Sequence, residues 1–211
     1  MLEEARIKIQ EIALQAYTEQ LVAGTSGNVS VYDHEREIMA ITPSNMNYGV
    51  MKSEDIVLMK VDGTIVEGEH KPSSEWRMHA GIYAKRSDVN AIIHTHSPYA
   101  TSFAVLHRSI PEILVEMLPF LGGDIPLSQF GMPGTDELAI NAEAVLKNRN
   151  ACLLMNHGVL VIGKNLDQAY VRAQYVEDAA RIYHYACELG EPKKLDENVL
   201  DAMREKYHLV K

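Results

Sequence analysis

Short apolar segments that stand in neighbouring pairs constrain the fold of this chain more than any other feature of its sequence. Three pairs occur, at residues 28–32 and 37–41, at 56–60 and 64–66, and at 151–155 and 159–162. The second pair flanks Asp62-Gly63, a dipeptide that favours a tight hairpin turn. Only antiparallel strands can be joined by connections as short as these. The pairs therefore predict a mainly antiparallel sheet.

Segments with helical periodicity separate the strand pairs. The predicted helices are 2–20, a helix opened by Pro72-Ser-Ser-Glu75 and running to about Lys85, 98–106, 136–147, 166–189 and 196–206. Further strands are expected at 89–94, 112–116 and 124–128. Strands interrupted by helices indicate a sheet covered by helices. With 211 residues and no Gly/Ser-rich linker, we expect residues 1–211 to form a single domain.

Charge and composition exclude several classes of protein. The net charge of −9 repels nucleic acid, and no basic stripe with interleaved aromatic residues is present. No apolar run reaches the roughly 20 residues of a membrane span, and charge from the third residue onward is atypical of a signal peptide. We interpret Cys152 and Cys187 as reduced thiols. We therefore expect a cytoplasmic protein without nucleic-acid or membrane partners. A small phosphorylated ligand remains possible, because hydroxyl and backbone N–H groups can hold it.

His94-Thr-His96 ends one of the apolar strands. Residues i and i+2 of a strand point to the same side, so the two imidazoles are placed next to each other as a metal ion requires. A pair of surface or core histidines without a ligand is an equally good interpretation of this motif taken alone.

His157 stands at the end of a second apolar strand, in Asn156-His157-Gly158. A histidine in such a position is by itself more often structural. Together with His94 and His96, it would complete the open site with three protein ligands that is typical of catalytic zinc. Three neutral imidazoles leave the ion nearly its full charge, which suits the stabilisation of an anionic intermediate.

Glu75 is the candidate base, in the first turn of a predicted helix after Ser73 and Ser74. The alternative is a carboxylate that only interacts favourably with the helix N-terminus. Free N–H groups of that turn also offer a place for phosphate. Two further turns, Thr25-Ser-Gly-Asn28 and Ser44-Asn45, have the same chemistry, although each alone could be simply a turn.

Several segments of the chain together resemble the class II aldolase/adducin family, most closely its L-fuculose-1-phosphate aldolase-like branch. The matching stretches are Gly24-Thr-Ser-Gly-Asn-Val-Ser-Val31, Ile41-Thr-Pro-Ser44, Pro72-Ser-Ser-Glu-Trp-Arg77, His94-Thr-His-Ser97, Arg108-Ser-Ile-Pro111, Leu146-Lys-Asn-Arg149 and Asn156-His-Gly158. The combination of Ser-Ser-Glu, His-x-His and His-Gly in this order is specific. The resemblance runs over nearly the whole chain.

The resemblance implies an α/β fold, a central and mainly antiparallel sheet between helix layers (an α/β/α three-layer sandwich), and a homotetramer with its sites at subunit interfaces. It implies that His94, His96 and His157 bind zinc, with Mn²⁺ or Co²⁺ as alternative ions, and that Glu75 lies near or on the metal. The implied phosphate-binding residues are Thr25, Ser26, Gly27, Asn28, Ser44, Asn45, Ser73 and Ser74.

The activity implied by the resemblance is reversible cleavage of a ketose-1-phosphate of the L-fuculose or 5-deoxyribulose type. The products are dihydroxyacetone phosphate and an aldehyde, formed through a metal-stabilised enediolate with Glu75 as acid/base. No lysine lies in an apolar strand, so nothing indicates a Schiff base. Tyr207 resembles a tyrosine that such aldolases supply to the neighbouring subunit's site as a proton donor; the alternative is a terminal aromatic without a function.

Two positions depart from the family pattern. Glu116 stands where the fuculose-phosphate aldolases carry a tyrosine for the aldehyde end, and Asn45 stands where they usually carry glycine. Asn45 can adopt the left-handed conformation that the turn needs. Glu116 puts the aldehyde in doubt, because a carboxylate is a different proton donor from a phenol; the alternative is a plain edge-strand carboxylate.

Two other interpretations compete with the aldolase. A sugar-phosphate dehydratase of the methylthioribulose-1-phosphate type uses a glutamate as acid/base, as Glu116 would allow. A 4-epimerase usually carries aspartate at the position of Glu75, which counts against it. A non-catalytic adducin-like assembly module lacks the metal histidines, whereas this chain retains all three together with Glu75.

Overall fold

The computed structural model describes residues 2–209, and its eight strands form a single sheet. The strands are β1 (Asn28–Asp33), β2 (Ile38–Ile41), β3 (Val57–Met59), β4 (Ile65–Glu67), β5 (Ala91–Thr95), β6 (Leu127–Ser128), β7 (Ala151–Leu154) and β8 (Gly158–Gly163). Their order across the sheet is β4-β3-β2-β1-β5-β8-β7-β6. Every neighbouring pair is antiparallel except β6 and β7. The mainly antiparallel sheet expected from the sequence is confirmed.

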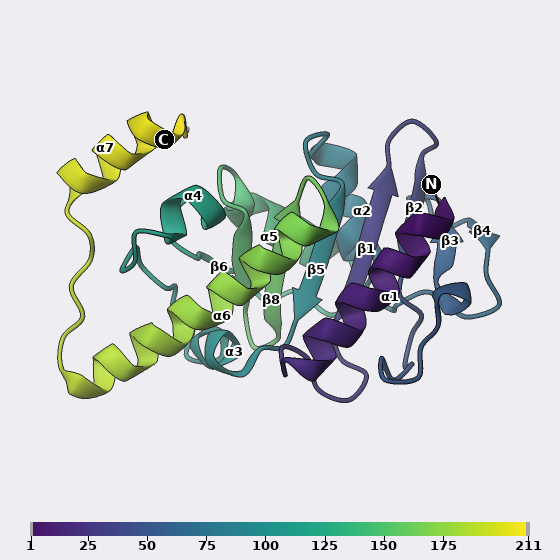
Figure 1. Cartoon of the computed structure of the whole chain (residues 1–211), viewed down its shortest axis with the longest axis horizontal. Coiled ribbons are helices and arrows are strands. Elements are labelled where there is room, and N and C mark those ends of the chain that lie inside the picture. The colour runs from purple at the N-terminus through teal and green to yellow at the C-terminus, as the bar shows by residue number, and fades with distance from the viewer. Residues whose placement is uncertain (1, 210–211) are drawn as a thin grey trace.

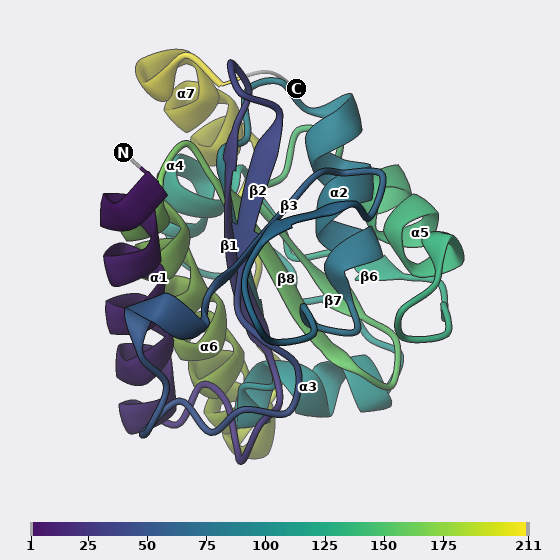
Figure 2. The same ribbon diagram turned by 90° about the vertical axis from the view of Figure 1, so that its right-hand side faces the viewer.

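Helices cover both faces of this sheet, as Figures 1 and 2 show. The helices are α1 (Leu2–Thr18), α2 (Trp76–Lys85), α3 (Pro98–Val105), α4 (Met117–Leu121), α5 (Asp136–Leu146), α6 (Leu166–Leu189) and α7 (Glu197–Tyr207), with a 3₁₀ turn η1 (Ser53–Asp55). Helices α1 and α6 lie on one face, and α2 and α5 lie on the other. The three-layer α/β/α arrangement is therefore confirmed.

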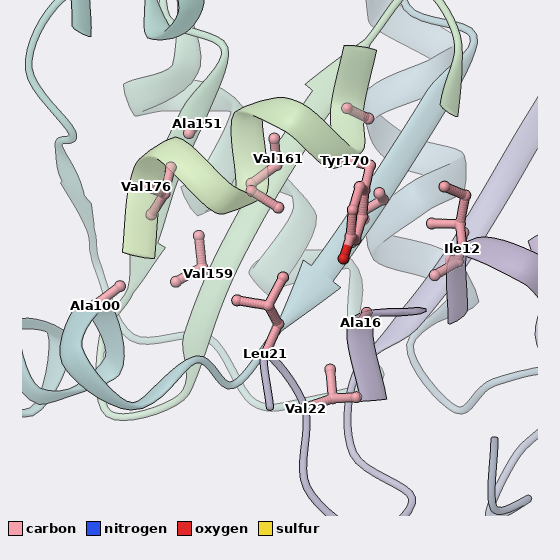
Figure 3. Close-up of a cluster of buried hydrophobic side chains, with 14 of the residues drawn as sticks. Ile12, Ala16, Leu21, Val22, Ala100, Ala151, Val159, Val161, Tyr170 and Val176 are labelled. Carbon is pink, nitrogen blue, oxygen red and sulfur yellow. The ribbon is translucent and has the colours of Figure 1, made fainter. Parts of the chain in front are cut away.

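Each face of the sheet has its own apolar core. Along β5, Ile93 packs with the α1 and α6 side of the molecule, whereas its neighbour Ile92 packs with the α2 and α5 side. This alternation follows from the two-residue period of a strand. Figure 3 shows the first core, where Ile12 of α1 and Val176 of α6 lie on the same side of the sheet as Val161 of β8. Because both faces of the sheet are covered, β7 and β8 carry apolar side chains on both of their faces.

Helix α1 buries one stripe of its surface against the sheet. Ile9, Ile12, Ala13 and Ala16 are buried, and their spacing of three, one and three residues matches the helical period. Ile7 falls outside the stripe, and 43% of its surface is exposed. This resolves the imperfect periodicity at the start of the helix, since Ile9 belongs to the buried face and Ile7 does not.

The prediction of a strand at 112–116 is wrong. Residues 112–116 form bends and turns that lead into α4, a helix that the sequence pattern did not predict. The β-branched side chains in this segment favour a strand, but no strand lies beside it. Instead, the carbonyl of Glu112 accepts a hydrogen bond from the backbone N–H of Leu195. The neighbouring strand expected at 124–128 is confirmed only in part, since β6 contains just Leu127–Ser128.

No helix among residues 2–209 combines the length and the apolar character that crossing a membrane requires.

Candidate active site

The three histidines singled out in the sequence meet at the end of β5 that leads into α3. His94 lies in β5, His96 follows that strand, and His157 lies in the turn between β7 and β8. Their candidate ligand nitrogens all lie within 4.8 Å of one another. Strand β8 pairs directly with β5, and this pairing brings His157 to the other two histidines across more than 60 residues of sequence.

The hydrogen bond of His94 fixes which of its nitrogens is free. Nδ1 of His94 lies 2.8 Å from the carbonyl oxygen of Val159. A carbonyl can only accept, so Nδ1 carries a proton, and in the neutral ring Nε2 is the nitrogen with the free lone pair. This Nε2 lies 2.9 Å from Nε2 of His96. A backbone carbonyl that orients an imidazole in this way is the usual second contact of a metal-binding histidine.

Gly158 allows the strands to approach closely at this point. A Cβ atom there would lie 2.4 Å from the carbonyl oxygen of Thr95 and 3.1 Å from ring atoms of His94 and His96. Any larger residue would push β8 away from the end of β5. The glycine after His157 is thus part of the geometry that brings the histidines together.

Glu75, the residue before α2, directs its carboxylate at the histidines. Oε2 of Glu75 lies 3.1 Å from Nε2 of His94, and Oε1 lies 3.2 Å from Nε2 of His157. Burial alone would raise the pKa of Glu75, but the neighbouring His94 and His157 and the amide of Asn28 lower it well below its usual range. The carboxylate is therefore ionised at neutral pH.

These residues fit a divalent cation. Burial, together with His94, lowers the pKa of His96 and of His157 to about 4, so both imidazoles are neutral at pH 7, the form that binds metal. Oε1 of Glu75 is buried without a hydrogen-bond donor. The lone pairs of three imidazoles and an unsatisfied carboxylate oxygen face one another. A single proton could not bond to all four groups, whereas a divalent cation can.

Three turns lie side by side next to the histidines. Asn28 pairs with His94 across β1 and β5. The turn after β2 is joined to the segment before α2 by two backbone hydrogen bonds, Ser44 N–H to Lys71 carbonyl and Ser73 N–H to Thr42 carbonyl. The residues predicted to hold phosphate are thus adjacent in space.

The members of these turns differ in how free their polar groups are. The Ser26 hydroxyl already donates to the carbonyl of Ala23 at 2.6 Å, and the Ser73 hydroxyl accepts from the N–H of Glu75 at 3.3 Å. Thr25 and Ser74 are exposed, and Ser44 is half-buried. Asn45 has a φ of 56°, so it adopts the left-handed conformation expected where the family usually has glycine.

A buried polar group behind Glu75 was missed in the sequence. Nδ2 of Asn28 donates to Oε2 of Glu75 at 3.0 Å, and Oδ1 of Asn28 accepts from Nε2 of His79. His79 is fully buried in α2. His79 stands four residues after Glu75, a spacing that places both on one face of the helix predicted from the sequence, and this signal could have indicated that the two residues are close.

The structure does not bring Glu116 or Tyr207 to the histidines of the same chain. Glu116 is exposed at the start of α4, so the interpretation as an edge-strand residue is wrong. Tyr207, at the end of α7, has 42% of its surface exposed. Helices α4 and α7 pack on each other at the end of the sheet opposite α3 (Figures 1 and 2). The histidines lie at the α3 end.

A groove opens beside the three histidines. His96 lines it together with Phe103 of α3, Arg108 in the segment after α3, and His184 of α6. Its volume of about 730 Å³ falls in the range of small-molecule sites. The site is therefore accessible from the surface of the chain.

Comparison with known proteins identifies the family. Residues 7–184 match the profile of the class II aldolase and adducin N-terminal domain. The chain belongs to the class II aldolase and adducin family. The resemblance found in the sequence is confirmed.

Individual relatives are similar over nearly their full length. The chain is 36% identical over 207 residues to the 5-deoxy-D-ribulose 1-phosphate aldolase of Bacillus thuringiensis, covering 98% of this chain and 97% of the relative. It is 36% identical to the 5-methylthioribulose-1-phosphate/5-deoxyribulose-1-phosphate aldolase of Rhodospirillum rubrum, covering 93% of this chain and 88% of the relative. The structure of an L-fuculose 1-phosphate aldolase superposes with a TM-score of 0.92 at 39% identity, covering 98% of this chain and 97% of that one. All three are aldolases, in agreement with the aldehyde-lyase expected from the sequence.

Proposed function

We propose that this protein is a zinc-dependent aldolase that reversibly cleaves a ketose-1-phosphate to dihydroxyacetone phosphate and an aldehyde. The observation that carries the proposal is the contact of the Glu75 carboxylate with His94 and His157 at 3.1 and 3.2 Å. It combines a cation site with an acid/base group at the same point. Aldol cleavage requires both of these functions.

Zinc is the ion proposed for this site, because three imidazoles with room for one further ligand are typical of catalytic zinc. Mn²⁺ and Co²⁺ are the alternatives. When bound, the ion would polarise the ketose carbonyl and stabilise the negative charge of the enediolate left by cleavage. His94, His96 and His157 would hold it, and Val159 would keep His94 in the correct tautomer.

Glu75 would carry the proton. As a carboxylate, it can remove the proton from the carbon of dihydroxyacetone phosphate in the condensation direction. As a carboxylic acid, it returns that proton after cleavage. Its neighbour Asn28 holds Oε2 at 3.0 Å, which leaves Oε1 without a hydrogen bond from the protein. We therefore assign the proton transfer to Oε1.

The substrate phosphate would bind in the three adjacent turns at residues 25–28, 44–45 and 73–74. Backbone N–H groups and hydroxyls supply hydrogen bonds to the phosphate oxygens, and the start of α2 adds a favourable dipole. Among the predicted residues, the hydroxyls of Thr25, Ser44 and Ser74 are the best placed donors, because the Ser26 hydroxyl is engaged within its own turn.

The aldehyde end of the site would be completed by a second subunit. Glu116 and Tyr207 lie on helices that pack on each other and face away from the histidines of their own chain. In the proposed homotetramer, α4 and α7 of one subunit contribute these side chains to the site of its neighbour. We also propose that residues 1–211 form a single domain and that the protein is cytoplasmic.

Assaying the zinc-loaded protein on two substrates tests the function. 5-Deoxyribulose-1-phosphate and L-fuculose-1-phosphate are each incubated with enzyme, and release of dihydroxyacetone phosphate and aldehyde is measured. We expect zinc-dependent release of both products from at least one substrate, and the names of the relatives favour the 5-deoxyribulose compound. A diketone without any aldehyde would indicate a dehydratase. Absence of cleavage across both substrates would contradict the proposal.

A further inference from the structure

A chain of buried polar side chains extends from Glu75 into the layer between α2 and the sheet. Its members are Asn28 and Ser30 of β1, and His79 and Tyr83 of α2. Asn28 and Tyr83 are almost fully buried, and Ser30 and His79 have no exposed surface. Consecutive members are in hydrogen-bond contact, with 2.6 Å between Ser30 Oγ and His79 Nδ1 and 2.7 Å between Ser30 Oγ and the Tyr83 hydroxyl.

Each hydrogen bond in this chain has one possible direction. The Glu75 carboxylate only accepts, so the amide nitrogen of Asn28 must face it, and Oδ1 of Asn28 must face His79. An amide oxygen also only accepts, so Nε2 of His79 carries the proton. Burial of His79 favours the neutral ring, whose Nδ1 then accepts from the Ser30 hydroxyl. The Ser30 hydroxyl gives its only hydrogen to His79, so the Tyr83 hydroxyl is the donor in its contact with Ser30. It donates either to the Ser30 Oγ or to the Ser30 carbonyl, which is 3.1 Å away.

The donors therefore all point toward the active site. Tyr83 donates to Ser30, Ser30 to His79, His79 to Asn28, and Asn28 to Oε2 of Glu75. Such a chain fixes the orientation of the Asn28 amide, which otherwise could turn by 180° and place its oxygen against the carboxylate. Hydrogen bonds that donate in sequence also strengthen one another.

We propose that His79 is a positioning residue for Glu75, and that it acts by holding the Asn28 amide with its NH₂ group on Oε2. Ser30 and Tyr83 support it by fixing the tautomer of its ring. Oε1 is then the oxygen left for proton transfer. This inference rests on the proposed function, in which Glu75 is the acid/base.

A role in stability alone would not require this arrangement. Aliphatic side chains would fill the space between α2 and β1 without leaving polar groups that must be satisfied, and buried polar groups stabilise a fold only when every partner is in place. The hydrogen-bonded chain ends on the Glu75 carboxylate, which is the acid/base of the proposed reaction. We therefore assign the chain a positioning function.

The test compares His79→Leu with His79→Gln. Leucine removes the donor to Asn28, whereas the glutamine amide can still donate to it. The readouts are zinc content, kcat and KM for ketose-phosphate cleavage, and exchange of the carbon-bound proton of dihydroxyacetone phosphate with D₂O. The exchange reaction reports proton transfer without any aldehyde.

We expect His79→Leu to keep its zinc and to lose kcat and proton exchange by the same factor, on the order of 10–10²-fold, because misplaced catalytic groups cost this much. KM should change by less than about threefold, since ground-state binding is not affected. His79→Gln should recover to within about fivefold of the unmodified enzyme in both rates. A rise in KM alone would place His79 in phosphate binding, and reduced stability with unchanged kcat would make it structural; either result overturns the proposal.

Two further measurements keep the proposal testable if these variants or the assay fail. If His79→Leu does not fold, Ser30→Ala replaces it as the test of the proposal. We expect Ser30→Ala to lose about threefold to tenfold in kcat with unchanged KM. ¹⁵N NMR of the histidine rings of the unmodified protein is independent of activity. The neutral Nε2–H tautomer of His79 is expected, and a ring protonated at Nδ1 overturns the proposal. If the unmodified protein neither exchanges the proton of dihydroxyacetone phosphate nor cleaves a ketose phosphate, the proposed function fails. The NMR result then tests by itself whether the hydrogen bonds run in the proposed direction.

Discussion

His94 shows how a single backbone contact decides the chemistry of a side chain. The carbonyl of Val159 accepts a hydrogen bond from Nδ1, so that in the neutral ring the lone pair of Nε2 faces His96 and Glu75. Burial keeps His96 and His157 in the same neutral state by lowering the pKa of each to about 4. At the scale of residues, the site is thus prepared for a cation before any cation binds.

Replacing one of the three histidines should remove the metal. We expect His157→Ala to lose bound zinc and to reduce cleavage activity by at least about 10²-fold, because two imidazoles do not hold the ion at low concentration. The metal content of the purified protein and its activity are measured together. His70→Ala is the control, since His70 is exposed and its imidazole pairs with Asp55. Full activity of His157→Ala without metal would contradict the assignment.

The role of Glu75 can be separated from that of the histidines. Glu75→Gln has nearly the same shape and leaves all three imidazoles, so we expect zinc to remain bound. The neutral amide cannot take up a proton, and both kcat and proton exchange of dihydroxyacetone phosphate should fall on the order of 10²–10⁴-fold. Metal analysis combined with the exchange assay distinguishes this result from loss of the ion. A variant that still exchanges at the normal rate would rule out Glu75 as the base.

At the scale of elements, the pairing of β5 with β8 assembles the site. The two strands pair from Ala91 with Gly163 to Thr95 with Val159, and the register places the turn that bears His157 beside the end of β5. Helix α2 covers the other face, and Glu75 immediately precedes it. The catalytic groups thus come from ends of regular elements, which hold them more precisely than long loops would.

Gly158→Ala tests the importance of this strand contact. The added Cβ would lie 2.4 Å from the Thr95 carbonyl oxygen, so β8 must move away from the histidines. We expect a loss of about 1–3 kcal/mol in the free energy of unfolding, as for other overpacked sites, together with weaker zinc binding. Gly49→Ala is the control, because its Cβ meets mainly the side-chain oxygen of Asn47 at 3.1 Å. Equal zinc affinity in the two variants would show that the close approach is dispensable.

At the scale of the whole molecule, a single chain separates residues that the proposed reaction needs together. The histidines lie at the α3 end of the sheet, and α4 and α7 lie at the opposite end (Figures 1 and 2). If Tyr207 acts at all, it must act in another subunit. The proposed homotetramer provides this arrangement, because a cyclic assembly places one end of each subunit against the other end of its neighbour.

Mixed tetramers test the sharing of sites between subunits. Glu75→Gln should be nearly inactive, and Tyr207→Phe should keep about a tenth of the activity, because loss of one proton donor costs less than loss of the base. In an equal random mixture, about one quarter of the sites combine an intact Glu75 with an intact neighbouring Tyr207. Activity should then rise to about a quarter of the unmodified value. Independent subunits would give about one twentieth.

The buried histidines should make the metal-free protein sensitive to acid. Burial lowers the pKa of His79 to about 3, compared with about 6.5 for an unfolded chain. Between these values only the unfolded state binds the proton, so stability falls as the pH decreases, by about 1.4 kcal/mol per pH unit for this residue. His96 and His157 act in the same direction down to about pH 4.

Urea unfolding of the chelated protein at pH 7, 6 and 5 measures this effect. His79→Gln lacks one of the titrating groups, so its stability should depend on pH less steeply than that of the unmodified protein, by about 1.4 kcal/mol per pH unit. The same slope for both proteins would show that His79 is protonated in the folded state.

Much of the fold could be predicted from local sequence. Helices α1, α5, α6 and α7 and the hairpins around 33–36 and 62–63 follow from periodicity and turn residues, which act over a few positions. The strand at 112–116 was predicted wrongly, because the backbone carbonyl of Glu112 bonds to the N–H of Leu195 rather than to a neighbouring strand. Leu195 lies 83 positions further along the chain, and no local pattern encodes such a contact.

The sequence by itself determined the residue types of the site and the family to which the chain belongs. Spacing marked His94 and His96 as neighbours, the ends of other predicted elements offered His157 and Glu75 as candidates, and the resemblance joined them into one site. Only the tertiary structure decided the tautomer of His94, the chain from Tyr83 to Glu75, and the separation of Tyr207 from the histidines. The physical reason is that hydrogen-bond direction and burial depend on which atoms from distant segments meet, and this is fixed only when β1, β5, β8 and α2 pack together.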